Sequence, residues 1–93
     1  MVGAVRRAAI RDSKLRDQAL RAAKSAALNI AEAAGRVSPA DRARVFAIAR
    51  GEAMEAIAAV EIAVVAGDAD RSSLDTCLPI ADLLVALLTG LCR

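Results

Sequence analysis

The amino-acid sequence predicts an all-α protein: an up-down antiparallel bundle of three long helices with a short or missing first helix. Three observations support this fold class. About a quarter of the 93 residues are Ala, the strongest helix former. The hydrophobic fraction is 57%, although the chain has one Phe and no Tyr or Trp. Only five Gly and two Pro interrupt the helical patterns, and the length suits a single domain, residues 1–93.

The first long helix is expected at residues 13–34, and Gly35 is expected to end it. At 100° per residue, an apolar stripe lies beside a polar ribbon made of Lys14, Gln18, Arg21, Ser25, Asn29 and Glu32. If the helix continued back through the preceding residues, Arg7 and Arg11 would extend this ribbon as a basic track. The polar ribbon fits a solvated face, a binding surface or a network between subunits. For Ser25, Asn29 and Glu32 we favour the network, because short polar side chains beside Ala suit close helix contact.

The second helix is expected at residues 39–66, because Ser38 is a good N-cap and Pro39 suits the first helical position. Gly67 should end it. A core stripe is predicted at Phe46, Ala49, Ala53, Ile57, Val60 and Val64. Ile48, Ala59 and Ile62 add an apolar patch on the far side. A helix that is apolar on two sides needs two neighbours, so this pattern predicts self-association.

The third pattern contains Pro79, which should restart the helix, so we expect a short helical turn followed by a main helix at residues 79–91. The main helix is apolar around most of its circumference, which again indicates self-association. The residues expected at the oligomer interface are Ile48, Ala59, Ile62, Leu84 and Leu88.

Charge is divided along the chain. Residues 1–50 carry eleven Lys and Arg against four Asp and Glu, and residues 51–93 carry two against seven, giving net charges of +7 and −5. This division fits a basic face for an anionic partner, or complementary halves that attract each other within or between subunits.

Several functional classes are disfavoured. The chain has no His, the commonest general base and transition-metal ligand. No catalytic residue, cofactor or metal is expected; the one alternative, a carboxylate enzyme or metal site at Glu32, Glu52 and Glu55, has few ligands. Cys77 and Cys92 are 15 positions apart, about 22 Å along one helix, which predicts free thiols.

The expected location is the cytoplasm. Arg6, Arg7 and Arg11 interrupt the N-terminal apolar residues, so no secretory signal is predicted. The most apolar stretch, residues 83–88, is too short to cross a membrane, so no membrane partner is expected.

A family resemblance covers about residues 13–65. The stretch RAAKSAALNIAEAAGR, residues 21–36, resembles the signature Arg-Ala-Ala-x-Ser-Ile-Pro-x-Asn-Ile-Ala-Glu-Gly-x-Gly-Arg. That signature belongs to four-helix bundle proteins that include those encoded in intervening sequences of 23S ribosomal RNA genes and the accessory variability proteins of diversity-generating retroelements. A second stretch, FAIARGEAME at residues 46–55, is similar to the family's Phe-Leu-x-x-Ala-x-Gly-Ser-x-x-Glu. Here Ala26-Ala27 replaces Ile-Pro, Ala33 replaces the first Gly and Glu52 replaces the Ser.

The resemblance implies a non-enzymatic homo-oligomer, often a pentameric ring, in which Gly35 and Gly51 are close-packing points. In the retroelement branch, the basic surface binds nucleic acid and a reverse transcriptase. The candidate nucleic-acid-binding residues here are Arg6, Arg7, Arg11, Lys14, Arg21 and Arg36. With almost no aromatic residues, contacts to RNA or DNA must go mainly to phosphates. The alternative is a pure protein–protein assembly module that binds no nucleic acid.

Overall fold

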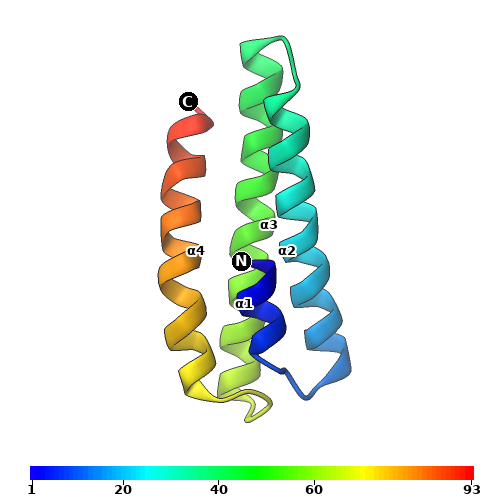
Figure 1. The fold of residues 1–93 in the computed structure, drawn as a ribbon, viewed down its shortest axis with the longest axis vertical. Helices are drawn as coiled ribbons and strands as arrows, with labels where there is room; N and C mark the ends of the chain where they lie inside the picture. Colours follow the sequence, from blue (N-terminus) through cyan, green and yellow to red (C-terminus); the bar gives the residue numbers. More distant parts are fainter.

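The computed structural model describes residues 1–93 as four helices: α1 (Val2–Arg7), α2 (Ser13–Ala34), α3 (Pro39–Val65) and α4 (Arg71–Leu91) (Figure 1). The three long helices run alternately up and down along the longest dimension of 44 Å. We call the end with the α3–α4 loop the lower end and the end with the α2–α3 turn the upper end. The predicted all-α bundle is confirmed, and its first helix is only six residues long.

Side-chain caps begin both α2 and α3, and the cap of α3 is the one expected from the sequence. The Asp12 carboxylate accepts a hydrogen bond from the Leu15 N–H at 2.9 Å, and the Ser38 hydroxyl accepts one from the Asp41 N–H at 3.4 Å. Gly67 follows α3 with φ of +80°, a conformation that favours Gly. The boundaries predicted for these two helices are therefore confirmed to within one residue.

The chain turns sharply between α1 and α2. Ala9 has φ of +51°, outside the right-handed helical region, and breaks the helix before Asp12. The Arg11 N–H donates to the Asp68 carbonyl at 2.8 Å, which holds this turn against the α3–α4 loop. The extension of the polar ribbon through Arg7 and Arg11 is therefore wrong: neither residue belongs to α2.

Pro79 lies inside a continuous α4, so the predicted restart at this residue is wrong. A proline removes one helical hydrogen bond, here the bond to the Asp75 carbonyl. Both Pro79 and Asp75 are exposed, and water can donate to that carbonyl instead. Since the residues before and after Pro79 both pack into the core, tertiary contacts keep the two parts in one helix.

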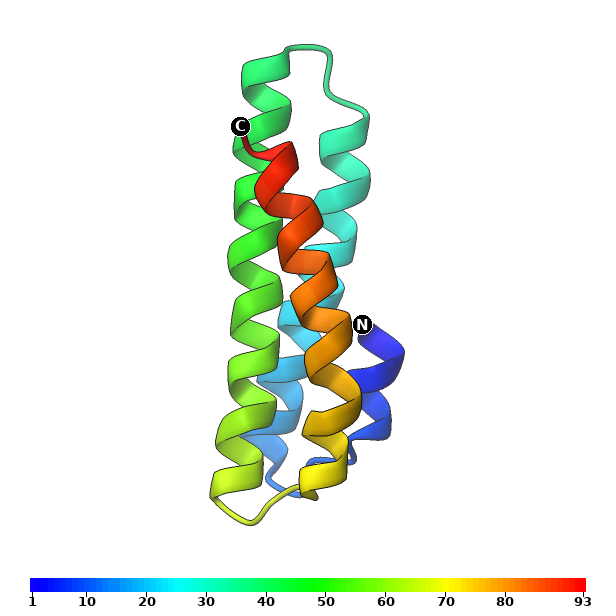
Figure 2. The ribbon, with the colours of Figure 1, turned by 90° about the vertical axis from the view of Figure 1, so that its left-hand side faces the viewer.

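The core is unequal along the bundle. The lower cluster has fifteen buried residues, of which ten are Ala, contributed by all four helices and the loops next to them. The upper cluster has five: Ala33, Val45, Phe46, Ala49 and Leu88. Both α2 and α4 pack on α3, and α1 lies beside their lower halves only (Figure 1, Figure 2). The upper end therefore has the smaller core because no fourth helix covers it.

The outer surface of α4 is unusually apolar. By length and composition this 21-residue helix could cross a membrane, a test that core helices of soluble proteins also pass. Only 17% of its most apolar window is buried within the chain. The prediction from residues 83–88 alone thus underestimated the length of the apolar segment.

Candidate nucleic-acid interface

Five of the six candidate nucleic-acid-binding residues lie in the lower half of the bundle. Arg6 and Arg7 end α1, Lys14 begins α2, and Arg21 follows two turns later on α2; all four are exposed and none forms an ion pair. Arg11 is also exposed, but its guanidinium donates to the Gly67 carbonyl at 2.5 Å, which fixes it against the α3–α4 loop. The structure therefore leaves four of the six candidate cations available for an anionic ligand.

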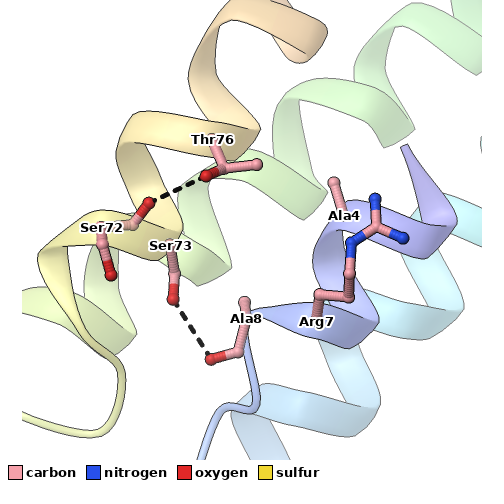
Figure 3. Close-up of a pocket in the computed structure, with 6 residues that line it drawn as sticks. All are labelled: Ala4, Arg7, Ala8, Ser72, Ser73 and Thr76. Atoms are coloured by element: carbon pink, nitrogen blue, oxygen red, sulfur yellow. Dashed lines mark hydrogen bonds between the residues drawn. The ribbon is translucent and has the colours of Figure 1, made fainter.

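A polar pocket of about 220 Å³ lies between α1 and the first turns of α4 (Figure 3). Its lining comprises Ala4, Arg7, Ala8, Ser72, Ser73 and Thr76. The Ser73 hydroxyl donates to the Ala8 carbonyl at 3.4 Å, and the Thr76 hydroxyl donates to the Ser72 carbonyl at 3.1 Å. Hydroxyl groups can rotate to donate to a new acceptor, and no carboxylate lines the pocket. One guanidinium and three hydroxyls are groups that bind a phosphate oxygen.

Cys77 is buried one residue after Thr76, beneath this surface. Burial raises the pKa of its thiol, although the positive charges of the Met1 amino group and Arg7 act in the opposite direction. The buried thiol therefore stays protonated at neutral pH and acts as a small apolar side chain. Cys77 and Cys92 are both free thiols, as predicted.

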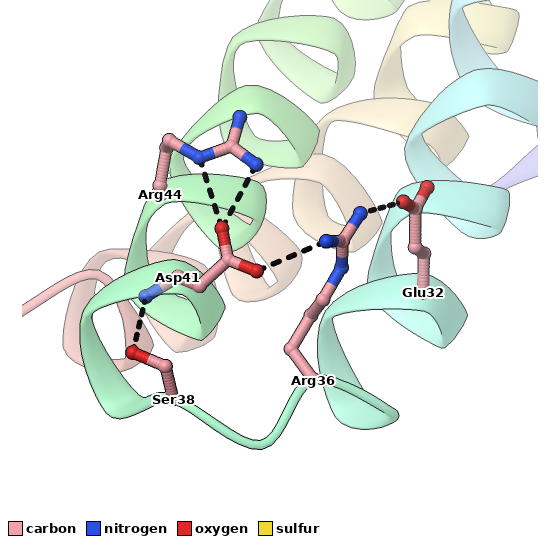
Figure 4. A network of polar contacts seen from close by, with 5 residues as sticks. All are labelled: Glu32, Arg36, Ser38, Asp41 and Arg44. Carbon is pink, nitrogen blue, oxygen red and sulfur yellow. Dashed lines mark hydrogen bonds and ion pairs between the residues drawn. The ribbon is translucent and has the colours of Figure 1, made fainter.

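Arg36, the sixth candidate, lies at the upper end in a polar network (Figure 4). It pairs with Glu32 and, at 3.0 Å, with Asp41, and Arg44 pairs with the other oxygen of Asp41 at 2.9 Å. The hydrogen bond to Glu32, helped by the charge of Asp41, raises the pKa of Arg36. Hydrogen bonds from Arg44, helped by the charge of Arg36, lower the pKa of Asp41 despite an opposing effect of burial.

These pairs neutralise the charge of Arg36 and brace the α2–α3 turn. Arg36 also lies on the order of 30 Å along the helix axis from Lys14. Its assignment to a shared nucleic-acid surface is therefore corrected: the structure separates it from the other cations.

The polar ribbon of α2 runs along the edge of α3 in the same chain. Asn29 donates a hydrogen bond to the half-buried Glu52, and Gln18 donates to Glu55 at 3.5 Å. Glu32 pairs with Arg36, and Ser25 lines a separate hollow of about 380 Å³ with Asp17, Leu20, Arg21, Lys24 and Leu28. Asn29 and Glu32 thus have partners within one chain, and the expected network between subunits stays a prediction.

The expected interface residues divide into exposed and buried groups. Ile48 is 45% exposed and Ile62 is 55% exposed, so both can meet a partner. Ala59 and Leu88 are 3% and 1% exposed in the chain's own core, which corrects their assignment to a subunit surface. Helical spacing alone missed this, because α2 packs against the Ala59 side of α3 and the upper core encloses Leu88. Leu84 is half-buried against the upper core.

The two glycines from the resemblance have no close helix neighbour within the chain. A Cβ on Gly51 would meet nothing within 4 Å. A Cβ on Gly35, the residue after α2, would meet only carbonyl oxygens of its own turn, the nearest at 3.5 Å. Within the chain no second helix packs closely at either glycine, so their role as close-packing points stays a prediction, and the surface of α3 is open at Gly51.

The structure places no group of three or more Cys, Asp or Glu side chains where they could share a metal ion. Glu32, Glu52 and Glu55 instead bind Arg36, Asn29 and Gln18 respectively.

Sequence reasoning missed the hydroxyl side of the polar pocket. Ser72 and Ser73 follow an acidic loop, where Ser is typical of a helix cap, and Thr76 belongs to no pattern that predicts a site. The available signal was the cluster of three hydroxyl residues within five positions at the start of a helix. Their approach to Arg7 depends on how α1 packs, which no local pattern predicts.

Comparison with known proteins adds one finding. The family model described as "23S rRNA-intervening sequence protein" matches residues 6–90, nearly the whole chain. Searches of curated proteins and of solved structures gave no match.

Proposed function

The chain belongs to the family of 23S rRNA-intervening sequence proteins, and from this membership and its surface we propose a non-enzymatic, self-associating bundle that binds nucleic acid through phosphates. The observation that carries the proposal is the set of unpaired cations on α1 and on the first half of α2. All three ion pairs lie at the upper end, whereas Arg6, Arg7, Lys14 and Arg21 have no carboxylate partner. Unpaired cations on one part of a surface attract a polyanion.

The polar pocket supplies a specific contact within this surface. A backbone phosphate would accept hydrogen bonds from Arg7 and from the hydroxyls of Ser72, Ser73 and Thr76. The only aromatic residue, Phe46, is 8% exposed in the upper core, so base stacking has no platform. Binding should therefore depend on salt and only weakly on base sequence, and both RNA and DNA are candidate ligands.

Binding of fluorescent generic RNA and duplex DNA, followed by anisotropy at several salt concentrations, tests the proposal. If all four cations neutralise phosphates, the logarithm of affinity for duplex DNA should fall against the logarithm of salt with a slope of about −3.6 per chain. Absence of binding at low ionic strength would leave the alternative, a protein–protein assembly module.

Two double variants separate the effect of local phosphate contacts on binding from the effect of net charge. Reversing Arg6 and Arg7 to Glu should weaken binding and reduce the slope by about 1.8, because two phosphate contacts are lost. Reversing Arg42 and Arg93 to Glu changes net charge equally but leaves the lower half untouched, so the slope should stay near the wild-type value. Equal losses in both variants would contradict a localised interface.

The proposal includes assembly in the cytoplasm into a homo-oligomer, with the pentamer implied by the resemblance as its expected form. Exposed apolar residues on α3 and α4 support association. Association multiplies weak phosphate contacts through avidity. Replacing Ile62 by Asp should dissociate the particle, because a carboxylate would be forced into an apolar contact; sedimentation of an unaltered particle would place Ile62 outside the interface.

The retroelement branch of the resemblance extends the proposal to a reverse transcriptase as protein partner. A reverse-transcriptase gene beside the gene for this chain would support that partner, and co-purification of the two proteins would test it.

A further inference from the structure

The face of α4 that contacts α1 continues upward beyond the end of α1 (Figure 1). At the lower end this face carries Ser73 and Thr76, which line the pocket against α1. At intervals of three or four residues it continues through Ile80, Leu84, Leu87 and Leu91. Leu87 and Leu91 are 58% and 51% exposed because nothing lies over them.

The corresponding face of α2 is apolar as well. Ala23 packs in the lower core with α1, and Ala27, Ile30 and Ala34 follow at helical spacing. We call the uncovered residues above α1 the front face: Ala27, Ile30, Ala34, Ile80, Leu84, Leu87 and Leu91. This set contains no charged side chain, so its partner must also be apolar.

A second apolar surface lies on α3, on the side of the molecule away from α1 (Figure 2). We call it the back face: Gly51, Met54, Ala58, Ile62 and Val65, spaced three or four residues apart. Met54, Ile62 and Val65 are 45%, 55% and 89% exposed. A shallow hollow of about 390 Å³, lined by Glu61, Ile62, Val65 and Ala66, lies at its lower end.

The two faces are complementary in the size of their side chains and in the charges that border them. The front face presents large Leu side chains, whereas the back face has small residues, Gly51 and Ala58, between larger ones, so the two can interdigitate. Glu55 and Glu61 border the back face, and Lys24 is an exposed cation on α2 one turn before Ala27. These charges favour contact between unlike faces.

The way α1 packs shows which kind of helix fits between α2 and α4. Its buried contacts are made by Ala4 and Val5, with Ala8 just beyond its end, so small and aliphatic side chains fill this position at the lower end. The back face of α3 offers the same kinds of side chain. Gly51 weakens a helix interior and no neighbour within the chain requires it, which is consistent with close approach by a second helix.

We propose that the back face of one copy docks on the front face of another copy, so that α3 occupies the fourth helix position above α1. This inference rests on the proposed self-association and identifies the surfaces that meet. Because the two faces differ and lie on opposite sides of the molecule, the contact is head-to-tail. Repeated contacts of this kind form a closed ring or a filament.

Two variants, each with one damaged face, test the contact by complementation. Leu87→Asp places a charge on the front face, and Gly51→Gln places a long side chain on the back face where its own chain leaves room. Each variant alone should be monomeric in native mass spectrometry and sedimentation. An equimolar mixture should form a 1:1 dimer, because the first variant keeps its back face and the second keeps its front face.

Matched controls show that lost assembly is not lost folding. Ala86→Asp introduces the same charge at an exposed neighbouring position on α4 and should assemble like the wild type. Ala86→Gln does the same for Gly51→Gln, because it adds the same side chain at this exposed position outside both faces. Circular dichroism of all four variants should show unchanged helix content.

The possible failures are distinguishable. A monomeric wild-type protein would overturn self-association itself, and with it this contact. An oligomeric wild type whose state neither variant alters, or two monomeric variants that do not combine, would overturn only the front-to-back contact. A monomeric wild type that floats with phosphatidylcholine vesicles, while Leu87→Asp does not, would assign the front face to a lipid bilayer instead.

Discussion

Arg7 and Arg36 carry the same charge in opposite surroundings. Arg36 lies between two carboxylates, which use its hydrogen-bonding capacity within the chain. Arg7 lines a pocket with hydroxyls and has no carboxylate partner. Residue type and position in the sequence made both candidates for phosphate contact. Only the surroundings of each side chain distinguish an arginine that is available to a ligand from one that is paired within the fold.

Acid should loosen the α2–α3 turn through Asp41. Because the pKa of Asp41 is lowered in the folded protein, its contribution to stability is present above the ordinary carboxyl value and is lost as pH falls through the lowered value. The melting temperature should therefore fall more steeply below about pH 4 in the wild type than in Asp41→Asn. Thermal melts from pH 7 to pH 2 measure this difference, and parallel curves would contradict a role for the network.

At the scale of elements, capping and turn residues in the sequence predicted where the helices end, because neighbouring residues determine helix ends. Ser38, Pro39 and Gly67 mark the ends of α3 in the sequence, and the structure has α3 within one residue of that prediction. The break at Ala9 has no Gly or Pro to signal it, so the path of α1 depends on packing. In the candidate site, the basic residues were predictable from charge. The hydroxyls that join Arg7 were not, because the pocket forms between helices distant in sequence.

Pro79 provides a test of how tertiary packing overrides local preference. A proline in a helix interior costs about 3 kcal/mol relative to Ala, and this proline is exposed, so its ring contributes little packing. Pro79→Ala should raise the free energy of unfolding by roughly 1–3 kcal/mol, measured by urea denaturation. Unchanged or lower stability would mean that the ring makes a contact in the assembled state.

At the scale of the whole molecule, stability should differ between the two ends. Fifteen buried residues surround the lower core, whereas five form the upper core beneath the front face. Regions with fewer buried apolar contacts open more readily.

Hydrogen exchange should reveal this gradient. In dissociated protein, such as Leu87→Asp, amides near Ala33 and Leu88 should exchange faster than amides near Ala22 and Val60. In assembled wild-type protein the upper amides should be protected more strongly, since a second copy would cover them. Uniform exchange along α2 and α4 in the dissociated form would contradict the unequal core.

The burial of Cys77 leaves the protein with one accessible thiol. Cys92, half-exposed after the end of α4, should react with a maleimide dye while the native fold shields Cys77. A single fluorophore could thus be attached near the upper end without engineering a new attachment point. Energy transfer between donor- and acceptor-labelled copies would then report how neighbouring subunits are oriented while they exchange in solution.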